Sequence, residues 1–517
     1  MKKILCFFTS LGVCGVLCTS ALHAQQKPLT AGKTRGNTAI EKTILQEKDN
    51  FYYINFKNYP VKDKSLPIGV FDSGTGGLTI LNKLVDFDLF NNQSKTAGKD
   101  AVPDFSKEKF IYLADQANMP YGNYYSEKKS DLLVEHVIKD AQFLLSDKYY
   151  PSANSKSFKT DKQPVKALVI ACNTATAYGK EYIEAFIKNT GIDLKVIGVI
   201  DAGAKGVLDV LQKDESGAIG VFATVGTVAS KGYENTILKM KNDLGYTGNL
   251  QVYNQGGYGL AEAVDEEPDF ISRNATAPRE NYRGPSLQNA AYKIDKTLLD
   301  IYNFDFDHNK MLCDSKNTDD CQNMQLNSAD NYVRYHLVSM LEKIRRTPGA
   351  QPLKALVLGC THYPYMDKEI RQVLNELYHY RKNDQYIYRP FMQENIHIID
   401  PAVNVAYELH QFLKEQNLFN PTGDMQNSEF FISVPNPDNK KVQLDEQGRF
   451  TYAYKYGRTN GEIQEYVKVV PFSKRNIPAE TIERFKTAIP TTHNLIQQFH
   501  QRSAKTKGLK AEEKITD

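Results

Sequence analysis

The sequence predicts an α/β fold with two pseudo-symmetric, mainly parallel-sheet domains, followed by a small C-terminal α+β appendage. The first observation is a repeated order of short apolar strand, Gly- or Thr-rich turn and helical segment, which is typical of α/β units with buried parallel strands. The expected strands are residues 68–71, 110–113, 167–170, 196–200, 219–222, 355–358 and 396–399.

An internal duplication is the second observation, and it indicates that the chain contains one structural half twice. Three sequence pairs recur in the same order: IGVF at 68–71 and 219–222, KALV leading to a cysteine at 166–172 and 354–360, and Ile-Asp at 200–201 and 399–400. One such pair arises easily by chance, whereas three in the same order indicate a repeated strand, turn and helix unit.

The third observation is a change of character after the second half. Residues 429–434 and 450–455 alternate as antiparallel strands do, and residues 481–498 have the pattern of a final helix. These elements predict the C-terminal α+β appendage.

The first residues have the order of a secretory signal peptide. Lys2 and Lys3 precede an apolar run, and Ala24 is followed by Gln25, so we expect a signal over residues 1–24 with cleavage after Ala24. A transmembrane anchor is the alternative, but the run is short for a bilayer and contains Thr, Ser and Gly. We therefore expect an exported, periplasmic protein with no membrane span after cleavage.

The remaining chain divides at changes in polarity and at the ends of the duplicated halves. The expected parts are an N-terminal extension at 25–66, domain 1 at 67–200 with 396–414, domain 2 at 201–395 with an insertion at about 267–332, a C-terminal extension at 415–502 and a mobile tail at 503–517.

Composition excludes some functions. The net charge is +3 and charged residues make up 24% of the chain, which gives no basic stripe and argues against a nucleic-acid partner. No His/Cys cluster has zinc spacing, so no metal is expected. Cys313 and Cys321 lie in a polar loop and could close a small disulfide in an oxidising compartment.

The other two cysteines of the mature chain, Cys172 and Cys360, carry the sharpest chemical signal. Each directly follows a buried strand and precedes a Thr-containing turn and a helix. Ligands bind at the carboxyl ends of strands in open α/β sheets, and a helix N-terminus lowers the pKa of a nearby thiol. Buried core cysteines and a redox pair are the alternative interpretations.

Two thiols that share one cleft suit inversion of a carbon centre. One removes a proton from one face and the other returns a proton to the opposite face. His362 and Asp72 are candidate helpers of the thiols. In the turn at 71–78, glycines let backbone N–H groups approach an anion, and Asp72 and Ser73 could hold an α-amino group and a carboxylate. The glycine spacing is not that of a dinucleotide site.

Five motifs together resemble those of glutamate racemases, which belong to the cofactor-independent aspartate/glutamate racemase family. They are FDSGTGG at 71–77, PYG at 120–122, ACNTA at 171–175, TVGT at 224–227 and GCTHYP at 359–364. The resemblance spans roughly residues 67–410. It implies two α/β domains with the active site in the cleft between them, no cofactor, and a last strand near Ile399 that returns to the first domain.

The resemblance also implies roles for single residues. Cys172 and Cys360 would be the proton acceptor and donor, with Asp72 and His362 as catalytic helpers. The residues that would bind or support the amino acid are Asp72, Ser73, Tyr121, Gly122, Asn173, Thr174, Thr227, Thr361 and His362. Where the family has a site-wall glutamate, the best ungapped match is Asp265, and the surrounding segment departs from the family pattern.

The expected function is therefore a racemase that interconverts L- and D-glutamate by two-cysteine proton transfer. Its partner would be a small acidic amino acid, and a homodimer is one expectation for its assembly. An aspartate or hydantoin racemase of the same family is an alternative, as is a non-catalytic periplasmic amino-acid-binding relative. Members of the family act in the cytoplasm, where they supply D-glutamate for peptidoglycan, so an exported relative would act elsewhere.

Overall fold

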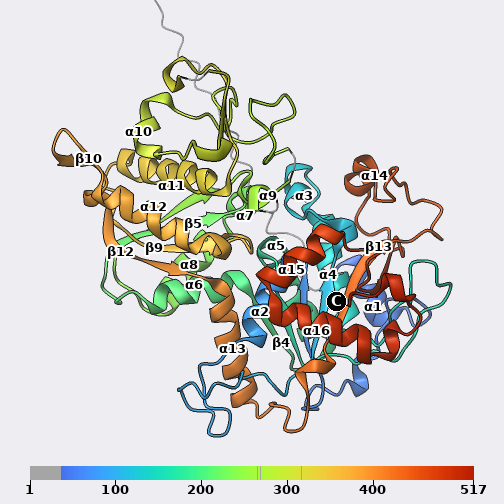
Figure 1. Cartoon of the computed structure of the whole chain (residues 1–517). Helices are drawn as coiled ribbons and strands as arrows, with labels where there is room; N and C mark the ends of the chain where they lie inside the picture. The colour runs from blue at the N-terminus through green and yellow to red at the C-terminus, as the bar shows by residue number, and fades with distance from the viewer. Residues whose placement is uncertain (1–36, 265, 268, 316, 517) are drawn as a thin grey trace, which may run out of the picture. The chain divides into compact units, whose positions relative to one another are not determined.

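The computed structural model describes residues 37–264, 266–267, 269–315 and 317–516 (Figure 1). The expected signal peptide at 1–24 and Asp265 lie outside these described residues. The strands of the first sheet are, in spatial order, β14 (Val467–Pro471), β13 (Glu429–Pro435), β2 (Phe110–Ala114), β1 (Ile68–Asp72), β3 (Ala167–Ile170) and β4 (Lys195–Gly198). Those of the second are β12 (Met392–Ile399), β9 (Leu353–Gly359), β5 (Gly217–Ala223) and β6 (Leu250–Gly256).

Every pairing in these two sheets is parallel except that between β13 and β14. Strands β1, β2, β3 and β5 are buried along their whole length, because helices cover both faces of a parallel sheet. The two α/β halves expected from the duplication are confirmed.

Helices occupy the connections between strands. Their bounds are α1 (Ala39–Gln46), α2 (Leu78–Val85), α3 (Gly122–Ser126), α4 (Ser130–Leu145), α5 (Asn173–Thr190), α6 (Val199–Asp209), α7 (Val225–Ser230), α8 (Gly232–Asp243), α9 (Leu260–Val264), α10 (Leu299–Tyr302), α11 (Ala329–Arg346), α12 (Asp367–His379), α13 (Pro401–Glu415), α14 (Tyr452–Gly457), α15 (Ala479–Ala488) and α16 (Pro490–Arg502). Two short hairpins, β7 (Met311–Cys313) with β8 (Met324–Leu326) and β10 (Arg381–Lys382) with β11 (Gln385–Tyr386), complete the strands.

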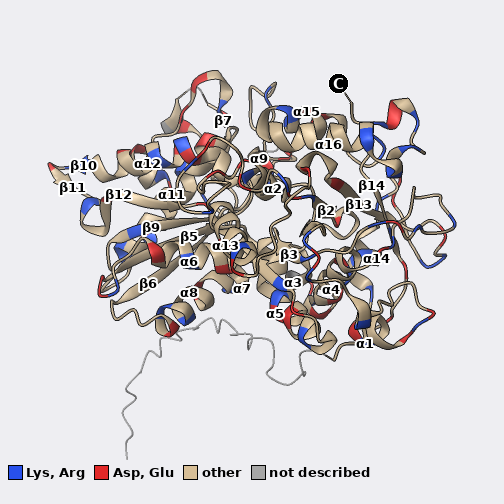
Figure 2. Cartoon of the chain, turned by 90° about the horizontal axis from the view of Figure 1, so that it is seen from below, with Lys and Arg blue, Asp and Glu red and all other residues tan. Residues whose placement is uncertain are grey.

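Alternate side chains of the first sheet form two cores, one on each face. Val70 and Tyr112 pack in a cluster with residues of α2, α13 and α16, and α16 lies beside α2 (Figure 2). Phe71 and Leu113 pack on the other face with α1, α4 and α5. In the second half, α11 and α12 cover one face of the sheet, and α6 and α8 cover the other (Figure 1).

The strand near Ile399 does not return to the first domain as expected. β12 pairs with β9 at the edge of the second sheet, with Ile398 opposite Leu356. Its buried Ile396 and Ile399 pack in two separate hydrophobic clusters of the second half. The expectation that residues 396–399 belong to domain 1 is therefore wrong. The following helix α13 connects the halves, because it packs on both α6 and α2.

The C-terminal region is part of the first sheet rather than a separate appendage. β13 pairs in parallel with β2, with Phe431 opposite Leu113, and β14 pairs with β13. Phe430 and Phe431 are fully buried, so their side chains complete the cores on both faces of this sheet. The appendage that we expected is corrected to an extension of the first domain.

Two local expectations in this region are also wrong. Residues 450–455 contribute to the short helix α14, which begins where the Thr451 hydroxyl accepts the N–H of Tyr454. Helical spacing brings Tyr452 and Tyr456 together one turn apart, with ring centroids separated by 4.6 Å. The single helix expected at 481–498 is two helices, α15 and α16.

The expected mobile tail at 503–517 is ordered over its described residues. Short 3-10 turns form at Ala504–Thr506 and Ala511–Glu513. Ile515 is 0% exposed within the core of the first half, and Arg475 forms an ion pair with Glu513. This apolar anchor and ion pair hold a segment whose charge alone predicted mobility.

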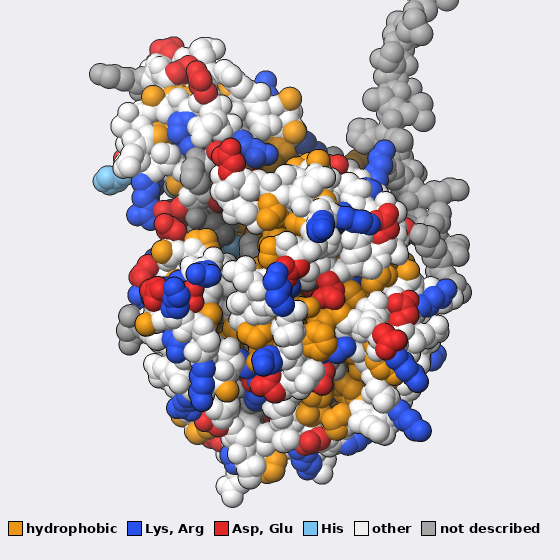
Figure 3. Space-filling view, turned by 90° about the vertical axis from the view of Figure 1, so that its right-hand side faces the viewer, with side chains coloured by type: hydrophobic (Ala, Val, Ile, Leu, Met, Phe, Trp, Pro, Cys, Tyr) orange, Lys and Arg blue, Asp and Glu red, His pale blue; other side chains and the backbone are white. Residues whose placement is uncertain are grey.

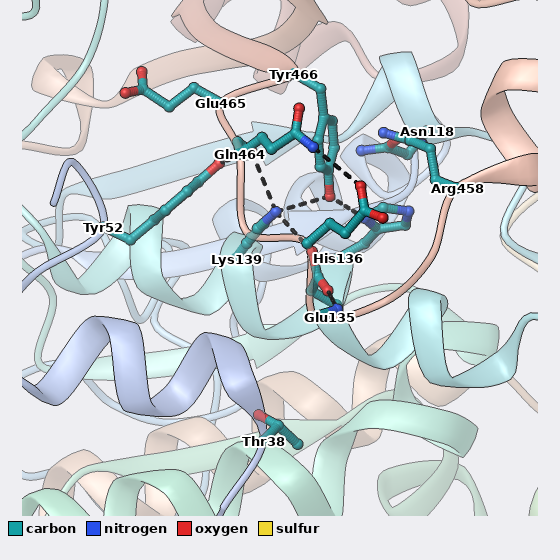
Figure 4. Close-up of polar contacts among 12 residues, drawn as sticks. Thr38, Tyr52, Asn118, Glu135, His136, Lys139, Arg458, Gln464, Glu465 and Tyr466 are labelled. Atoms are coloured by element: carbon teal, nitrogen blue, oxygen red, sulfur yellow. Dashed lines mark hydrogen bonds and ion pairs between the residues drawn. The ribbon is translucent and has the colours of Figure 1, made fainter. Parts of the chain in front are cut away.

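Buried polar contacts fasten the C-terminal region to helix α4 (Figure 4). The ammonium of Lys139 donates to the Glu135 carboxylate at 2.8 Å and to the Tyr466 hydroxyl at 2.9 Å. The Tyr466 hydroxyl also lies 2.9 Å from Nδ1 of His136. Because unpaired charges are costly to bury, these contacts hold residues 464–466 in a defined place.

The surface shows no concentration of one charge on the face seen in Figure 3, where acidic and basic side chains are interspersed. No helix among the described residues combines the length and apolarity that a membrane crossing requires. The N-terminal extension contributes α1, which begins with a capping box between Thr38 and Glu41 and packs on α4.

Candidate active site

Cys172 and Cys360 occupy matched places at the carboxyl ends of two parallel strands. Cys172 follows β3 and caps α5, where its sulfur accepts the N–H of Ala175 at 3.4 Å. Cys360 follows β9, and its sulfur lies 3.7 Å from Nδ1 of His362. Both are free thiols, 7% and 5% exposed respectively. The redox-pair alternative therefore has no disulfide to support it in this structure.

The turn after β1 surrounds Cys172 with polar groups. The Asp72 carboxylate accepts the N–H of Gly77 at 2.7 Å, and the Cys172 thiol donates to the Ser73 hydroxyl across 3.8 Å. Burial raises the pKa of Asp72. Burial, followed by the nearby charge of Asp72, also raises the pKa of Cys172. The lowering of the Cys172 pKa that we expected from a helix start is therefore outweighed, and this group is a neutral thiol at pH 7.

Gly76 marks the place where the two halves meet. A methyl group on Gly76 would lie 2.9 Å from Oγ1 of Thr361 and 3.5 Å from both Oδ2 of Asp72 and Cε1 of His362. Only a residue without a side chain allows this approach. The structure therefore brings together Asp72 from the first half with Thr361 and His362 from the second.

Tyr233 of α8 makes a second link between the halves. Its hydroxyl donates to Oδ1 of Asn173 at 2.8 Å, and its ring would lie 3.0 Å from a methyl group on Gly359. Tyr233 is 1% exposed. It therefore contacts Asn173, which follows Cys172, and Gly359, which precedes Cys360. The sequence analysis missed Tyr233, because neither its spacing nor its neighbours mark it.

The turns at 120–122 and 224–227 form a third meeting point of the two halves. A methyl group on Gly226, in α7, would lie 2.9 Å from the Cα of Gly122, so the turns at 120–122 and 224–227 touch. Thr227 is 2% exposed and accepts a hydrogen bond from the Thr224 hydroxyl at 3.0 Å. Thr174, in the first turn of α5, is 7% exposed.

The Tyr121 side chain points into the first domain. Its hydroxyl lies 2.6 Å from Asp115 and 2.7 Å from Asp140, inside the first domain. A phenol has one proton to donate, and burial raises the pKa of Asp140 well above its usual value. The Tyr121 hydroxyl is thus held between two buried carboxyl groups, and the raised pKa of Asp140 favours a proton on that carboxyl. The Tyr121 hydroxyl therefore makes its contacts inside the first domain.

Cys313 and Cys321 form a disulfide beside the β7–β8 hairpin of the insertion. Asp314 is close to both sulfurs. In the described part of the chain, these three residues are the only cluster whose side chains could together bind a metal ion. Because the disulfide uses both thiols, the group has no thiolate to offer a metal. The structure thus places this pair together as the sequence allowed.

Buried thiols at matched strand ends, with Asp72, Thr361 and His362 gathered around Gly76, define the candidate site of an α/β protein of two repeated halves. No protein-family model matches the chain. Curated glutamate racemases do match it.

The chain is 27% identical over 370 residues to the glutamate racemase of Thermoanaerobacter pseudethanolicus, a match that covers 71% of this chain and 88% of that protein. It is 26% identical over 353 residues to the glutamate racemase of Lactobacillus johnsonii, covering 68% and 83%. It is 34% identical to the Enterococcus faecalis glutamate racemase over 170 residues, covering 33% and 46%.

Solved glutamate racemase structures are also similar. Isoform RacE1 from Bacillus anthracis is 23% identical, with 71% of this chain and 87% of that one covered and a TM-score of 0.39. The resemblance to glutamate racemases that the motifs predicted is confirmed by the curated relatives. These relatives indicate that the chain is an isomerase of the racemase class.

Proposed function

We propose that the protein interconverts L- and D-glutamate by moving protons between Cys172, Cys360 and the α-carbon. The observation that carries this proposal is the matched placement of two buried thiols around one meeting point of the halves. The similarity to glutamate racemases supports the choice of glutamate among amino acids.

The proposed reaction breaks one C–H bond and forms another on the opposite face of the α-carbon. One cysteine, as thiolate, takes the α-proton, and the other, as thiol, donates its own proton to the carbanion. Cys172 is a neutral thiol at pH 7 because burial and Asp72 raise its pKa, which suits it to donate first. Cys360 has Nδ1 of His362 at 3.7 Å as the group that can receive its proton.

Asp72 and the glycine turn would position the substrate. The Asp72 carboxylate lies beside Cys172 and is 6% exposed, so an α-ammonium bound next to it would form a charge-assisted hydrogen bond. The backbone of residues 73–77 turns at the start of α2, where N–H groups can donate hydrogen bonds to an anionic carboxylate. Both groups of the amino acid would then be fixed while the thiols act.

The decisive test is exchange of the α-hydrogen of glutamate in deuterated solvent without added pyridoxal phosphate. We expect deuterium to appear in both enantiomers, with aspartate and other amino acids exchanging more slowly. A panel of D- and L-amino acids, with a 5-substituted hydantoin added, distinguishes the alternative racemases, which would prefer aspartate or hydantoins. Tight amino-acid binding without any exchange would instead support a non-catalytic binding protein and would overturn the proposal.

We also propose that the protein is exported. The signal-like residues 1–24 support this location, and so does the disulfide between Cys313 and Cys321, because such bonds persist in oxidising compartments. N-terminal sequencing of protein from the periplasmic fraction should begin at Gln25. Recovery of the unprocessed chain in the cytoplasm would contradict export.

A further inference from the structure

A groove of about 490 Å³ opens beside the meeting point of the two halves. Thr75, Gly76 and His362 form one side of it, and these residues adjoin the proposed site. The opposite side comes from the C-terminal extension, including residues 474–478 and helix α15. The C-terminal extension, which we expected to be a separate appendage, therefore forms one wall of a groove next to the proposed site.

The side of the groove that the extension provides carries more cationic than anionic lining residues. Its cationic residues are Arg449, Lys474, Arg475 and Arg484, and none of its lining residues is Asp or Glu. Arg449 and Arg475 have acidic partners in Asp445 and Glu513, while Lys474 is exposed to solvent. A concave surface that presents charge of one sign attracts ligands of the opposite sign, so the groove suits an anionic group.

The groove is also larger than an amino acid requires. It adjoins a second hollow of about 690 Å³, and the two share lining residues that include Arg449 and Arg475. Pockets of about 300–1,000 Å³ typically hold ligands of drug size. The extension thus offers space, as well as charge, beyond the place where the thiols would act on the α-carbon.

We propose that this groove is a binding subsite for the carboxylate of a peptide attached to the side chain of the substrate amino acid. The inference rests on the proposed racemase function, since that chemistry needs a free α-ammonium and a free α-carboxylate beside Asp72. A substituent can then be tolerated only on the side-chain carboxyl group, as in a γ-glutamyl peptide. Its terminal carboxylate would pair with Lys474 and Arg484 in the groove.

Two probes that differ in a single charge test the subsite. γ-Glutamylglycine ends in a carboxylate, and γ-glutamylglycinamide ends in a neutral amide of similar size. We expect the intact protein to exchange the α-hydrogen of the acid with kcat/KM about tenfold above that of the amide. The double variant Lys474→Gln/Arg484→Gln should reduce this preference to less than about twofold, with exchange of free glutamate unchanged.

Lys486→Gln provides the matched control, because Lys486 lies on the same helix, pairs with Glu483 and does not line the groove. It should keep the preference for the acid. Equal kinetics with the two probes, or exchange of free glutamate alone, would overturn the subsite while leaving the proposed function intact.

Calorimetric titration with both probes separates failure of the subsite from failure of the proposed function. Stronger binding of the acid that is lost in the double variant, without exchange of any compound, would support the subsite and contradict racemisation. Equal binding of acid and amide would overturn the subsite whether or not glutamate is racemised.

Discussion

Tyr233 donates a hydrogen bond to the side-chain oxygen of Asn173, 2.8 Å away, and so joins the second half of the protein to the residue that follows Cys172. Tyr233→Phe keeps the ring against Gly359 but leaves the buried Asn173 oxygen without this donor. We expect a loss of about 1–3 kcal/mol in the free energy of unfolding. Glutamate racemisation should fall by about tenfold or more in kcat/KM, because small displacements of reacting groups are costly.

Tyr246→Phe is the control for Tyr233→Phe. The Tyr246 hydroxyl also donates a hydrogen bond, to the backbone carbonyl of the buried residue Leu208 at 2.6 Å, but Tyr246 adjoins neither cysteine. Denaturant unfolding should show a comparable loss of stability in both variants, whereas only Tyr233→Phe should lose activity. Equal activity losses would show that the Tyr233 contact acts through stability alone.

Removing either thiol should separate exchange from inversion. In Cys172→Ala, Cys360 can still take and return a proton on its own face, and in Cys360→Ala the reverse holds. Each variant should therefore lose racemisation, with a fall of about 10²-fold or more, and retain deuterium exchange into one enantiomer only. The two variants should retain opposite enantiomers. Polarimetry and mass spectrometry measure the two processes, and full racemisation by either variant would contradict the two-thiol mechanism.

The contact between Gly226 and Gly122 predicts sensitivity to one methyl group. In Gly226→Ala the added carbon would lie 2.9 Å from the Cα of Gly122, and a backbone atom cannot move aside as a flexible side chain can. We expect the two turns to separate, with a loss of about 1–3 kcal/mol in the free energy of unfolding and a raised KM for glutamate. Gly508→Ala, where the added methyl meets no atom within 4 Å, should change neither quantity.

The sequence predicted the two halves and the thiol pair because repeated strands place Cys172 and Cys360 at equivalent ends. It did not predict that β13 joins β2, since this pairing connects residues more than 300 positions apart and local alternation does not encode strand neighbours. The motif around Tyr121 predicted a turn, but not that its hydroxyl turns inward to Asp115. The pKa direction of Cys172 was missed because burial, which the sequence does not state, outweighs the effect of the helix start.

The raised pKa of Asp140 predicts how stability changes with pH. Burial raises the pKa of Asp140 well above its ordinary value, so the folded state holds a proton that the unfolded state releases as pH rises. The stability associated with this group is full below its unfolded pKa of about 4 and declines as pH rises toward the folded pKa. Asp140→Asn cannot ionise and still has an N–H to donate to Tyr121. We therefore expect it to gain stability relative to the native protein as pH rises from about 4 to 8.

Urea unfolding at several pH values measures this difference, with Asp49→Asn, an exposed position, as the control that should show no such trend. A gain for Asp140→Asn that is constant with pH would contradict a raised pKa of Asp140, because a pKa that differs between the folded and unfolded states makes the contribution of that group depend on pH.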